Sequence, residues 1–193
     1  MEKSIVWKGL HYDIEEHCGI NYHDDCIRVH SEIEGWAEGK AVYVEYWLKL
    51  AVNWDVQEFE VSARVADTAF TYALTRDEQG YWKDNSGKQY HEFNGCRYID
   101  ISLTPFTNTL PVNGLHLAIG EQKEIEVVYI DVMHHDMRIF KQSYTQLKSQ
   151  QYKYESRGGD FFADIDVDED GLVTQYPGLF EMIRAIKHKP NNG

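Results

Sequence analysis

Several components are scarce in this 193-residue chain, and each scarcity excludes a class of protein. The three cysteines are an odd number at unpatterned spacings, which argues against a disulfide scaffold and favours a reducing compartment. No apolar run approaches the roughly 20 residues of a membrane-spanning helix, so we expect no integral membrane association. Lys and Arg number only 19 against 32 Asp and Glu, giving a formal charge of −13. Because such a chain repels phosphate backbones, we expect no nucleic-acid partner.

An export signal is also missing from the start of the sequence. Residues 1–8 hold basic residues but no apolar segment of the kind found in a secretory signal peptide. Together with the cysteine pattern, this predicts a cytoplasmic location. Apolar residues still make up 42% of the chain, enough for a folded core. The length suits one domain, so we expect residues 1–193 to form a single domain.

Proline is rare, with four residues, whereas aromatic residues are abundant: 13 Tyr, 8 Phe and 5 Trp. This composition favours β-structure. Strict alternation of apolar and polar residues predicts strands with one buried and one wet face, typical of antiparallel sheets. The alternating segments are residues 26–34, 41–50, 57–65, 98–103, 123–132 and 161–167. Turn signals such as Asn94-Gly95 and Asp170-Gly171 recur between them, as in a meander of hairpins.

One segment, residues 177–187, reads as a helix. Pro177 suits a first helical position, and an apolar stripe with helical spacing follows it: Leu179, Met182, Ile183 and Ile186. Residues 103–113 contain two prolines and predict an irregular crossing or a short helix. The chain is therefore predicted to be mainly β, an antiparallel sheet with one or two helices.

A weak internal duplication is a further possibility raised by the pattern. Residues 75–82 resemble residues 166–173, because each has an acidic pair, a turn glycine and an apolar pair. Acidic hairpin turns are common, so a shared local turn is the alternative explanation.

Two segments contain possible metal ligands, but their residue spacing does not match that of a metal site. Asp166-x-Asp168-x-Asp170-Gly171 matches the opening of a calcium loop, but the twelfth position is Pro177 instead of a bidentate Glu. We interpret this segment as an acidic hairpin. His134 and His135 are adjacent and would point to opposite faces of a strand, so a turn is favoured there. No metal and no cofactor is predicted.

Motifs for catalysis are also missing. The sequence has no Gly-rich phosphate loop, no Gly-x-Ser-x-Gly elbow and no His-Glu-x-x-His. A hydrolase or isomerase acting on a small hydrophobic or sugar substrate stays as an alternative hypothesis. In it, Asp100 or Glu155 is the acid or base, and Tyr144 or Tyr154 is the proton donor.

A central segment carries a family resemblance. Residues 94–115 contain Gly95-Cys96 and the string Thr-Asn-Thr-Leu-Pro at 107–111, and residues 176–179 read Tyr-Pro-Gly-Leu. These strings resemble the motifs of the bacterial "putative glycolipid-binding" family, formerly a domain of unknown function. The resemblance runs from about residue 7 to about residue 185. Two positions depart from the family pattern: Tyr98 stands where an acidic residue is expected, and Gly114 where an arginine is expected.

The resemblance implies a strongly curved antiparallel sheet, a half-barrel with one or two helices against its concave face. This shape is similar to carriers that move lipoproteins or lipids across the periplasm.

Our leading hypothesis is therefore non-enzymatic binding of an amphipathic, lipid-like ligand, such as a glycolipid, in the concavity of the sheet. The expected apolar lining is Val44, Tyr46, Leu48, Val61, Ile101 and Val127, and the expected ligand-binding residues at the mouth are Trp54, Asn108, Tyr144, Tyr152, Tyr154 and Tyr176. A module that binds a partner through a sheet edge or an aromatic surface is a third hypothesis.

Overall fold

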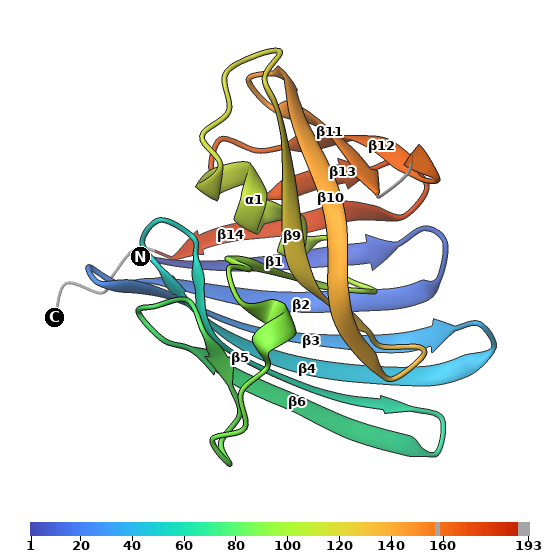
Figure 1. The fold of residues 1–193 in the computed structure, drawn as a ribbon. Helices are drawn as coiled ribbons and strands as arrows, with labels where there is room; N and C mark the ends of the chain where they lie inside the picture. Colours follow the sequence, from blue (N-terminus) through green and yellow to red (C-terminus); the bar gives the residue numbers. More distant parts are fainter. Residues whose placement is uncertain (157–158, 189–193) are drawn as a thin grey trace, which may run out of the picture.

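Fourteen strands form one sheet in the computed structural model, which describes residues 1–156 and 159–188 (Figure 1). The strand order is β7-β6-β5-β4-β3-β2-β1-β14-β13-β12-β11-β10-β9-β8, and the sheet does not close on itself. Strand β1 (Glu2–Gly9) pairs with β2 (Asp13–Tyr22) on one side and with β14 (Phe180–His188) on the other. The first and last strands therefore lie together in the middle of the sheet, with a meander on each side.

The two meanders form the two halves of the sheet. The first half continues from β2 through β3 (Cys26–Ala37), β4 (Lys40–Ala51), β5 (Val56–Val65), β6 (Thr68–Arg76) and the short β7 (Trp82–Lys83). The second half runs from β14 through β13 (Val173–Tyr176), β12 (Phe162–Val167), β11 (Gln151–Ser156), β10 (Asp136–Lys148) and β9 (Gln122–Asp131) to β8 (Tyr98–Ile101).

The prediction of a purely antiparallel sheet is wrong for one pair. Strands β8 and β9 are parallel, whereas every other described pair is antiparallel. Parallel neighbours need a long crossover, because the chain must return to the same end of the sheet. Here the crossover holds the 3₁₀ turn η2 (Phe106–Asn108) and the helix α1 (Thr109–Gly114), as the two prolines of residues 103–113 predicted. A second 3₁₀ turn, η1 (His91–Phe93), precedes β8.

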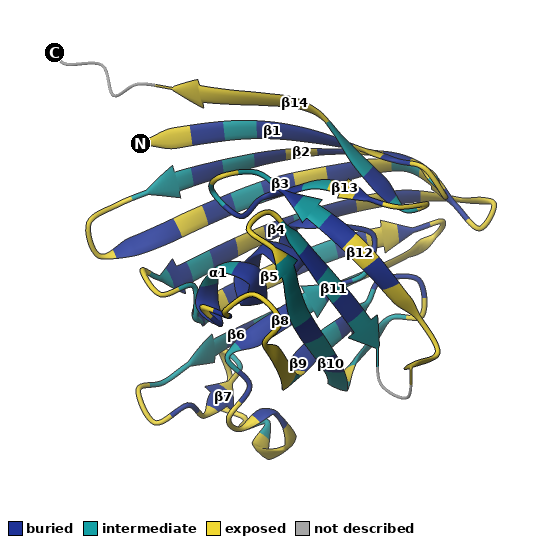
Figure 2. Ribbon diagram, turned by 90° about the horizontal axis from the view of Figure 1, so that it is seen from above, coloured by how far each residue is buried: buried dark blue, intermediate teal, exposed yellow. Residues whose placement is uncertain are grey.

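The alternating segments are confirmed as strands. In β4, Val44, Tyr46 and Leu48 are buried, whereas Tyr43 and Trp47 on the other face of the strand are exposed. Figure 2 shows the same alternation as bands of buried and exposed residues along the strands of the first half. Strands β1 and β2 were not singled out by the sequence, because Lys3 and Glu16 on their buried faces interrupt the alternation.

The predicted helix over residues 177–187 is wrong. Pro177 and Gly178 form a turn that the amide of Leu179 closes by donating to the carbonyl of Tyr176, and β14 follows. Strand β14 pairs with β1 from Phe180 opposite Gly9 to His188 opposite Glu2. Backbone pairing along a whole strand outweighs the weak helical propensity of this segment, which contains two β-branched isoleucines.

The crossover segment is packed inside the molecule. Residues 103–112 are all buried, including the polar Thr104, Thr107, Asn108 and Thr109. Figure 2 shows α1 between the strands of the first half and β9–β11 of the second. The Phe106 ring lies 6.4 Å from Trp7 of β1 and 6.3 Å from Tyr46 of β4.

The two segments compared for duplication share one local turn. Asp77 and Asp168 each accept backbone hydrogen bonds on the side chain from residues two and four positions later. Asp84 makes the same pair of bonds in a third turn. The calcium-like acidic string is thus a hairpin turn, and its Asp170 pairs with the buried Lys3 and with Lys187.

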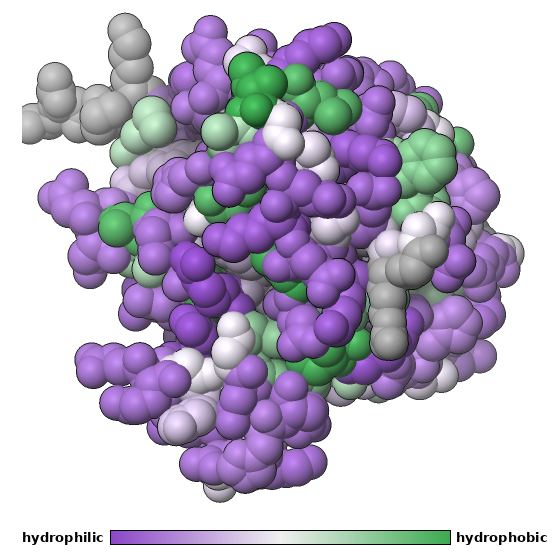
Figure 3. Space-filling view, turned by 45° about the horizontal axis from the view of Figure 1, so that its top comes forward, coloured by the Kyte–Doolittle hydropathy of each residue, from purple (hydrophilic) through white to green (hydrophobic). Residues whose placement is uncertain are grey.

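One face of the molecule is mainly polar. Figure 3 shows a hydrophilic face with small, separate hydrophobic patches, in keeping with the charge of −13. Within the described ranges, every helix is too short or too polar to cross a bilayer.

Gly35 provides a test of the close pairing of β2 and β3. Its φ is +141°, and a Cβ there would lie 2.1 Å from the Asp13 carbonyl oxygen. Replacing Gly35 with Ala should lower the free energy of unfolding by about 3 kcal/mol or more, because strain and a backbone clash add. Gly39→Ala is the matched control, with φ of +74° and open space around the new Cβ, and should cost only about 1 kcal/mol. Equal losses in urea titrations would contradict this account.

Candidate functional site

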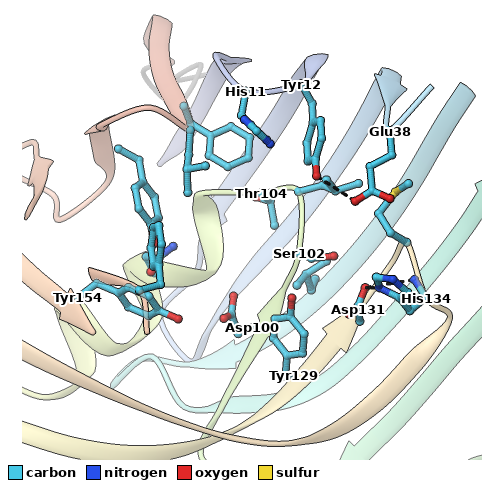
Figure 4. A pocket seen from close by; sticks show the side chains of 18 residues that line it. His11, Tyr12, Glu38, Asp100, Ser102, Thr104, Tyr129, Asp131, His134 and Tyr154 are labelled. Atoms are coloured by element: carbon cyan, nitrogen blue, oxygen red, sulfur yellow. Dashed lines mark hydrogen bonds and ion pairs between the residues drawn. The ribbon is translucent and has the colours of Figure 1, made fainter. Parts of the chain in front are cut away.

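A cavity of about 340 Å³ opens at one end of the sheet (Figure 4). Its floor comes from β8 and the segment that follows, including Asp100, Ser102 and Thr104. Its rim comes from turns: residues 11 and 12 between β1 and β2, Glu38 between β3 and β4, and His134 between β9 and β10. Alternate turns of a meander fall at the same end of a sheet, which is why residues distant in sequence meet here.

Asp100 is the carboxyl group at the cavity floor. Oδ1 accepts a hydrogen bond from Thr107 Oγ1 at 2.9 Å, and Oδ2 accepts one from Gln142 Nε2. Burial raises the pKa of Asp100, and the hydrogen bonds from Thr107 and Gln142 partly oppose this. Figure 4 shows the side chains of Tyr129 and Tyr154 converging on the Asp100 carboxyl group. Burial, and secondly the nearby Asp100 charge, raise the pKa of both tyrosines.

An aromatic wall stands beside this floor. The Tyr154 ring lies 6.1 Å from Phe161 and 6.2 Å from Tyr176, and Tyr176 lies 6.4 Å from Phe180. Tyr154, Tyr176 and Phe180 are buried, whereas Phe161 is 40% exposed. These rings come from β11, β13, β14 and the loop before β12. The wall therefore joins the buried floor to the open mouth.

The opposite side of the cavity is polar and acidic. At the rim, Tyr12 donates a hydrogen bond to Glu38 Oε1 at 3.1 Å. Asp131 faces His134 Nδ1 at 3.0 Å and the exposed Arg138 at 3.7 Å. The described residues hold no cluster of three His, Cys, Asp or Glu side chains that could bind a metal ion.

The backbone at the floor is strained. Leu103 has a φ of +73°, a left-handed conformation that bulky residues rarely adopt. It lies between β8 and the buried crossover, and both Leu103 and Thr104 line the cavity. The sharp turn at Leu103 directs the crossover inward, so the strain is tied to the formation of the cavity floor.

Three of the six predicted mouth residues line the cavity: Asn108, Tyr154 and Tyr176. Tyr144 lies behind them, and its hydroxyl donates to Asn108 Oδ1 at 2.8 Å. Tyr152 is buried outside the lining. Trp54 lies away from the cavity, in the turn between β4 and β5, where its ring contacts Tyr22.

The predicted apolar lining lies mostly elsewhere. Of that set only Ile101 lines the cavity. Val44, Tyr46, Leu48, Val61 and Val127 are packed in the hydrophobic core. The physical reason is the crossover segment, which covers the inner face of the sheet where an acyl chain was expected. For example, Phe106 packs against Tyr46.

The alternative catalytic residues are only partly assembled in the cavity, which Asp100 and Tyr154 both line. Asp100 faces the cavity, whereas Glu155 binds Lys153 Nζ at 2.8 Å and Gln122 Nε2 at 3.1 Å outside it. Tyr144 is engaged with Asn108. The cavity therefore contains one of the two proposed carboxyl groups.

Sequence reasoning missed Glu16, a carboxyl group buried beneath the floor. Its Oε1 accepts hydrogen bonds from Ser31 at 2.7 Å and from Tyr46, which also contacts Thr104. Its Oε2 is buried and has no hydrogen-bond partner in the described part of the chain. Burial raises the pKa of Glu16 to about 7, against opposing hydrogen bonds from Tyr46, Thr104 and Ser31. The sequence does contain a signal for this burial. Glu16 alternates with the apolar residues Ile14, Cys18 and Ile20, which form the buried face of β2.

Tyr98 and Gly114, the two positions expected to depart from the family pattern, lie against each other. A Cβ at Gly114 would lie 2.4 Å from the Tyr98 hydroxyl oxygen. Any side chain at position 114 would therefore displace Tyr98. Tyr98 in this position therefore requires glycine at position 114.

Comparison with known proteins assigns the fold to a family. The family model described as "Putative glycolipid-binding" matches residues 4–182. The chain belongs to this family. The resemblance carried by residues 94–115 and 176–179 is thereby confirmed. The family description itself names a kind of ligand without fixing a particular molecule.

A solved structure supports the membership. A DUF1089 family protein from Pseudomonas aeruginosa is similar to this chain, with 33% sequence identity and a TM-score of 0.75. The match covers 86% of this chain and 91% of that protein. No curated protein matches the chain.

Glu16 makes stability depend on pH. A glutamate has a pKa of about 4.3 in an unfolded chain, whereas that of Glu16 in the folded protein is about 7. The folded protein is therefore most stable below the lower of these values, where Glu16 is protonated. It loses stability as pH rises from about 4.3 to about 7. Relative to Glu16→Gln, the native protein should lose about 3 kcal/mol of unfolding free energy between pH 4.5 and pH 8, at ~1.4 kcal/mol per pKa unit. Urea titrations across this range measure the difference. The exposed neighbour Glu15→Gln is the control, and a Glu16→Gln profile parallel to the native one would contradict the buried-charge account.

Tyr144 should stabilise the floor through Asn108. Tyr144→Phe removes the donor to a buried amide oxygen, which should lower the free energy of unfolding by about 1–3 kcal/mol. Tyr152→Phe on the next strand is the matched control, since its hydroxyl makes no hydrogen bond to described residues. Chemical denaturation of both variants gives the comparison. If Tyr152→Phe costs as much as Tyr144→Phe, the bond to Asn108 is not the cause.

Proposed function

We propose that the cavity binds an amphipathic, lipid-like ligand without transforming it. The observation that carries the proposal is the division of one cavity into an aromatic wall and a polar side. Phe161 and Phe180 offer apolar surface, while Asp100 and Asn108 offer hydrogen-bonding groups. A volume of 340 Å³ lies within the usual range of about 300–1,000 Å³ for small-molecule sites.

The family description supports this proposal, because a glycolipid has both an apolar and a polar part. The half-barrel shape expected from lipid carriers belongs to the same proposal, with the crossover segment resting inside the curve. We also retain the cytoplasmic location in it, since all three cysteines are free and buried.

Phe161 and Phe162 provide a matched test. They are adjacent and both exposed, but only Phe161 lines the cavity, while Phe162 packs near Lys153. Phe161→Ala should weaken binding of the uncharged apolar dye Nile red about fivefold to tenfold, because apolar contact area is lost. Phe162→Ala should leave the dissociation constant unchanged. Fluorescence titration measures both, and equal effects, or no saturable binding by the native protein, would overturn the proposal.

A further inference from the structure

The cavity lining carries an unbalanced negative charge. Its described residues include three carboxyl groups, of Glu38, Asp100 and Asp131, and neither Lys nor Arg. Asp131 has a cationic partner, because Arg138 approaches it to 3.7 Å from outside the lining. Two carboxyl groups of the cavity, those of Asp100 and Glu38, are left without a paired cation in the described part of the chain.

Asp100 is the more enclosed of these two carboxyl groups. Among the described residues, its oxygens accept hydrogen bonds only from the uncharged side chains of Thr107 and Gln142. Burial raises the pKa of Asp100, and no neighbouring cation opposes this shift. A carboxylate held away from water is costly unless a positive charge pairs with it. A positively charged ligand would supply the partner that the protein does not provide.

Glu38 at the rim is placed differently. It is exposed in the turn between β3 and β4, where Tyr12 donates a hydrogen bond to it. Water screens an exposed charge, so a cation gains little by pairing with it. Both ends of the cavity are polar, and the enclosure of Asp100 is what distinguishes its carboxyl group from that of Glu38.

Aromatic side chains surround Asp100. Figure 4 shows Tyr129 and Tyr154 converging on its carboxyl group. Burial, and secondly the Asp100 charge, also raise the pKa of Tyr176, so that charge reaches a third cavity-lining tyrosine. Arg138 already lies over the Tyr129 ring, 4.8 Å from its centroid, whereas the rings of Tyr154 and Tyr176 hold no cation among the described residues.

This arrangement suits an organic ammonium group. The faces of aromatic rings attract cations, most strongly where water is excluded, and cages of aromatic rings recognise ammonium groups with methyl substituents. A carboxylate beside such rings adds direct attraction between opposite charges. The Tyr154 and Tyr176 rings lie 6.2 Å apart, next to Asp100, and both line the cavity.

Other polar groups fit the same residues less well. An anionic head group would meet the carboxyl groups of the lining without a described Lys or Arg there. A hydroxyl group donates a hydrogen bond to Asp100 but leaves its charge unpaired. A metal ion needs several ligands together, and the described residues hold no such cluster.

The volume admits an ammonium group with a chain. At roughly 30 Å³ per water-sized group, the cavity of 340 Å³ holds about eleven such groups. An octyl chain with a trimethylammonium group has about twelve non-hydrogen atoms, which is close to this capacity.

We propose that the ligand of the cavity is a cationic amphiphile, with Asp100 as the counter-charge of its ammonium group and the rings of Tyr154 and Tyr176 beside it. This assignment rests on the proposed function and adds to it the sign of the ligand's charge. The family description names no such charge.

Three octyl compounds with the same chain test the sign of the charge. Octyltrimethylammonium, octyl glucoside and octyl sulfate have a positive, an uncharged and a negative head group. Calorimetric titration below their micelle concentrations, at about 0.15 M salt to screen distant charges, gives each dissociation constant. Octyltrimethylammonium should occupy one site per chain and bind about tenfold more tightly than either of the others. Equal or tighter binding of octyl glucoside or octyl sulfate would overturn the assignment.

Matched variants separate Asp100 from the general attraction of a chain with a charge of −13. Asp100→Asn should weaken binding of octyltrimethylammonium about tenfold and leave that of octyl glucoside within threefold. Asp164→Asn removes one charge from an exposed position of β12 outside the cavity and should leave both dissociation constants within twofold. Glu38→Gln at the rim should weaken octyltrimethylammonium less than threefold.

The outcomes distinguish this assignment from the proposed function. Equal losses in Asp100→Asn and Asp164→Asn, or a larger loss in Glu38→Gln than in Asp100→Asn, would overturn the role of Asp100 while leaving amphiphile binding intact. If Asp100→Asn does not fold, the three head groups compared on the native protein decide the sign of the charge. If the native protein binds none of the three compounds, the proposed function itself fails.

Discussion

The structure depends on the buried polar crossover between β8 and β9. This segment lies between the two halves of the sheet, and its polar side chains Thr104, Thr107 and Asn108 are hydrogen-bonded, because unpaired buried groups are costly. Thr104 contacts Tyr46 of the first half, while Asn108 accepts from Tyr144 of the second. Asn113 donates to the carbonyl oxygen of Asp170 at 3.1 Å. The crossover thus links both halves and fixes the cavity floor.

The same constraint explains the character of the cavity. The crossover packs Phe106 and Leu110 against the inner face of the sheet, where both side chains are fully buried. The remaining space is small and combines a polar floor with one aromatic wall. Ion pairs around Asp170 hold the neighbouring turn to β1 and β14, so the wall that follows in β13 and β14 is positioned by the centre of the sheet. The packing of the crossover against the sheet therefore determines both the fold and the shape of the cavity.

Local patterns predicted most of this fold but not its long-range pairing. Alternation identified strands such as β4 and β5. Strand β14 was mistaken for a helix because its apolar spacing fits the helical period as well as that of a strand. Its partner β1 lies at the other end of the chain, so no local pattern indicates the pairing. Of the predicted ligand-binding residues, Asn108, Tyr154 and Tyr176 line the candidate cavity. The rim residues Tyr12 and Glu38 were missed because they sit in turns, whose meeting depends on strand order and not on any local signal.

The central claim is that an amphipathic ligand occupies the cavity, with its apolar part against the aromatic wall. Nuclear Overhauser contacts between octyl glucoside and the protein test it most directly. The account predicts contacts from the alkyl chain protons to the rings of Phe161 and Phe180, which line the cavity. Contacts confined to exposed rings outside the cavity, such as that of Trp47, would contradict it.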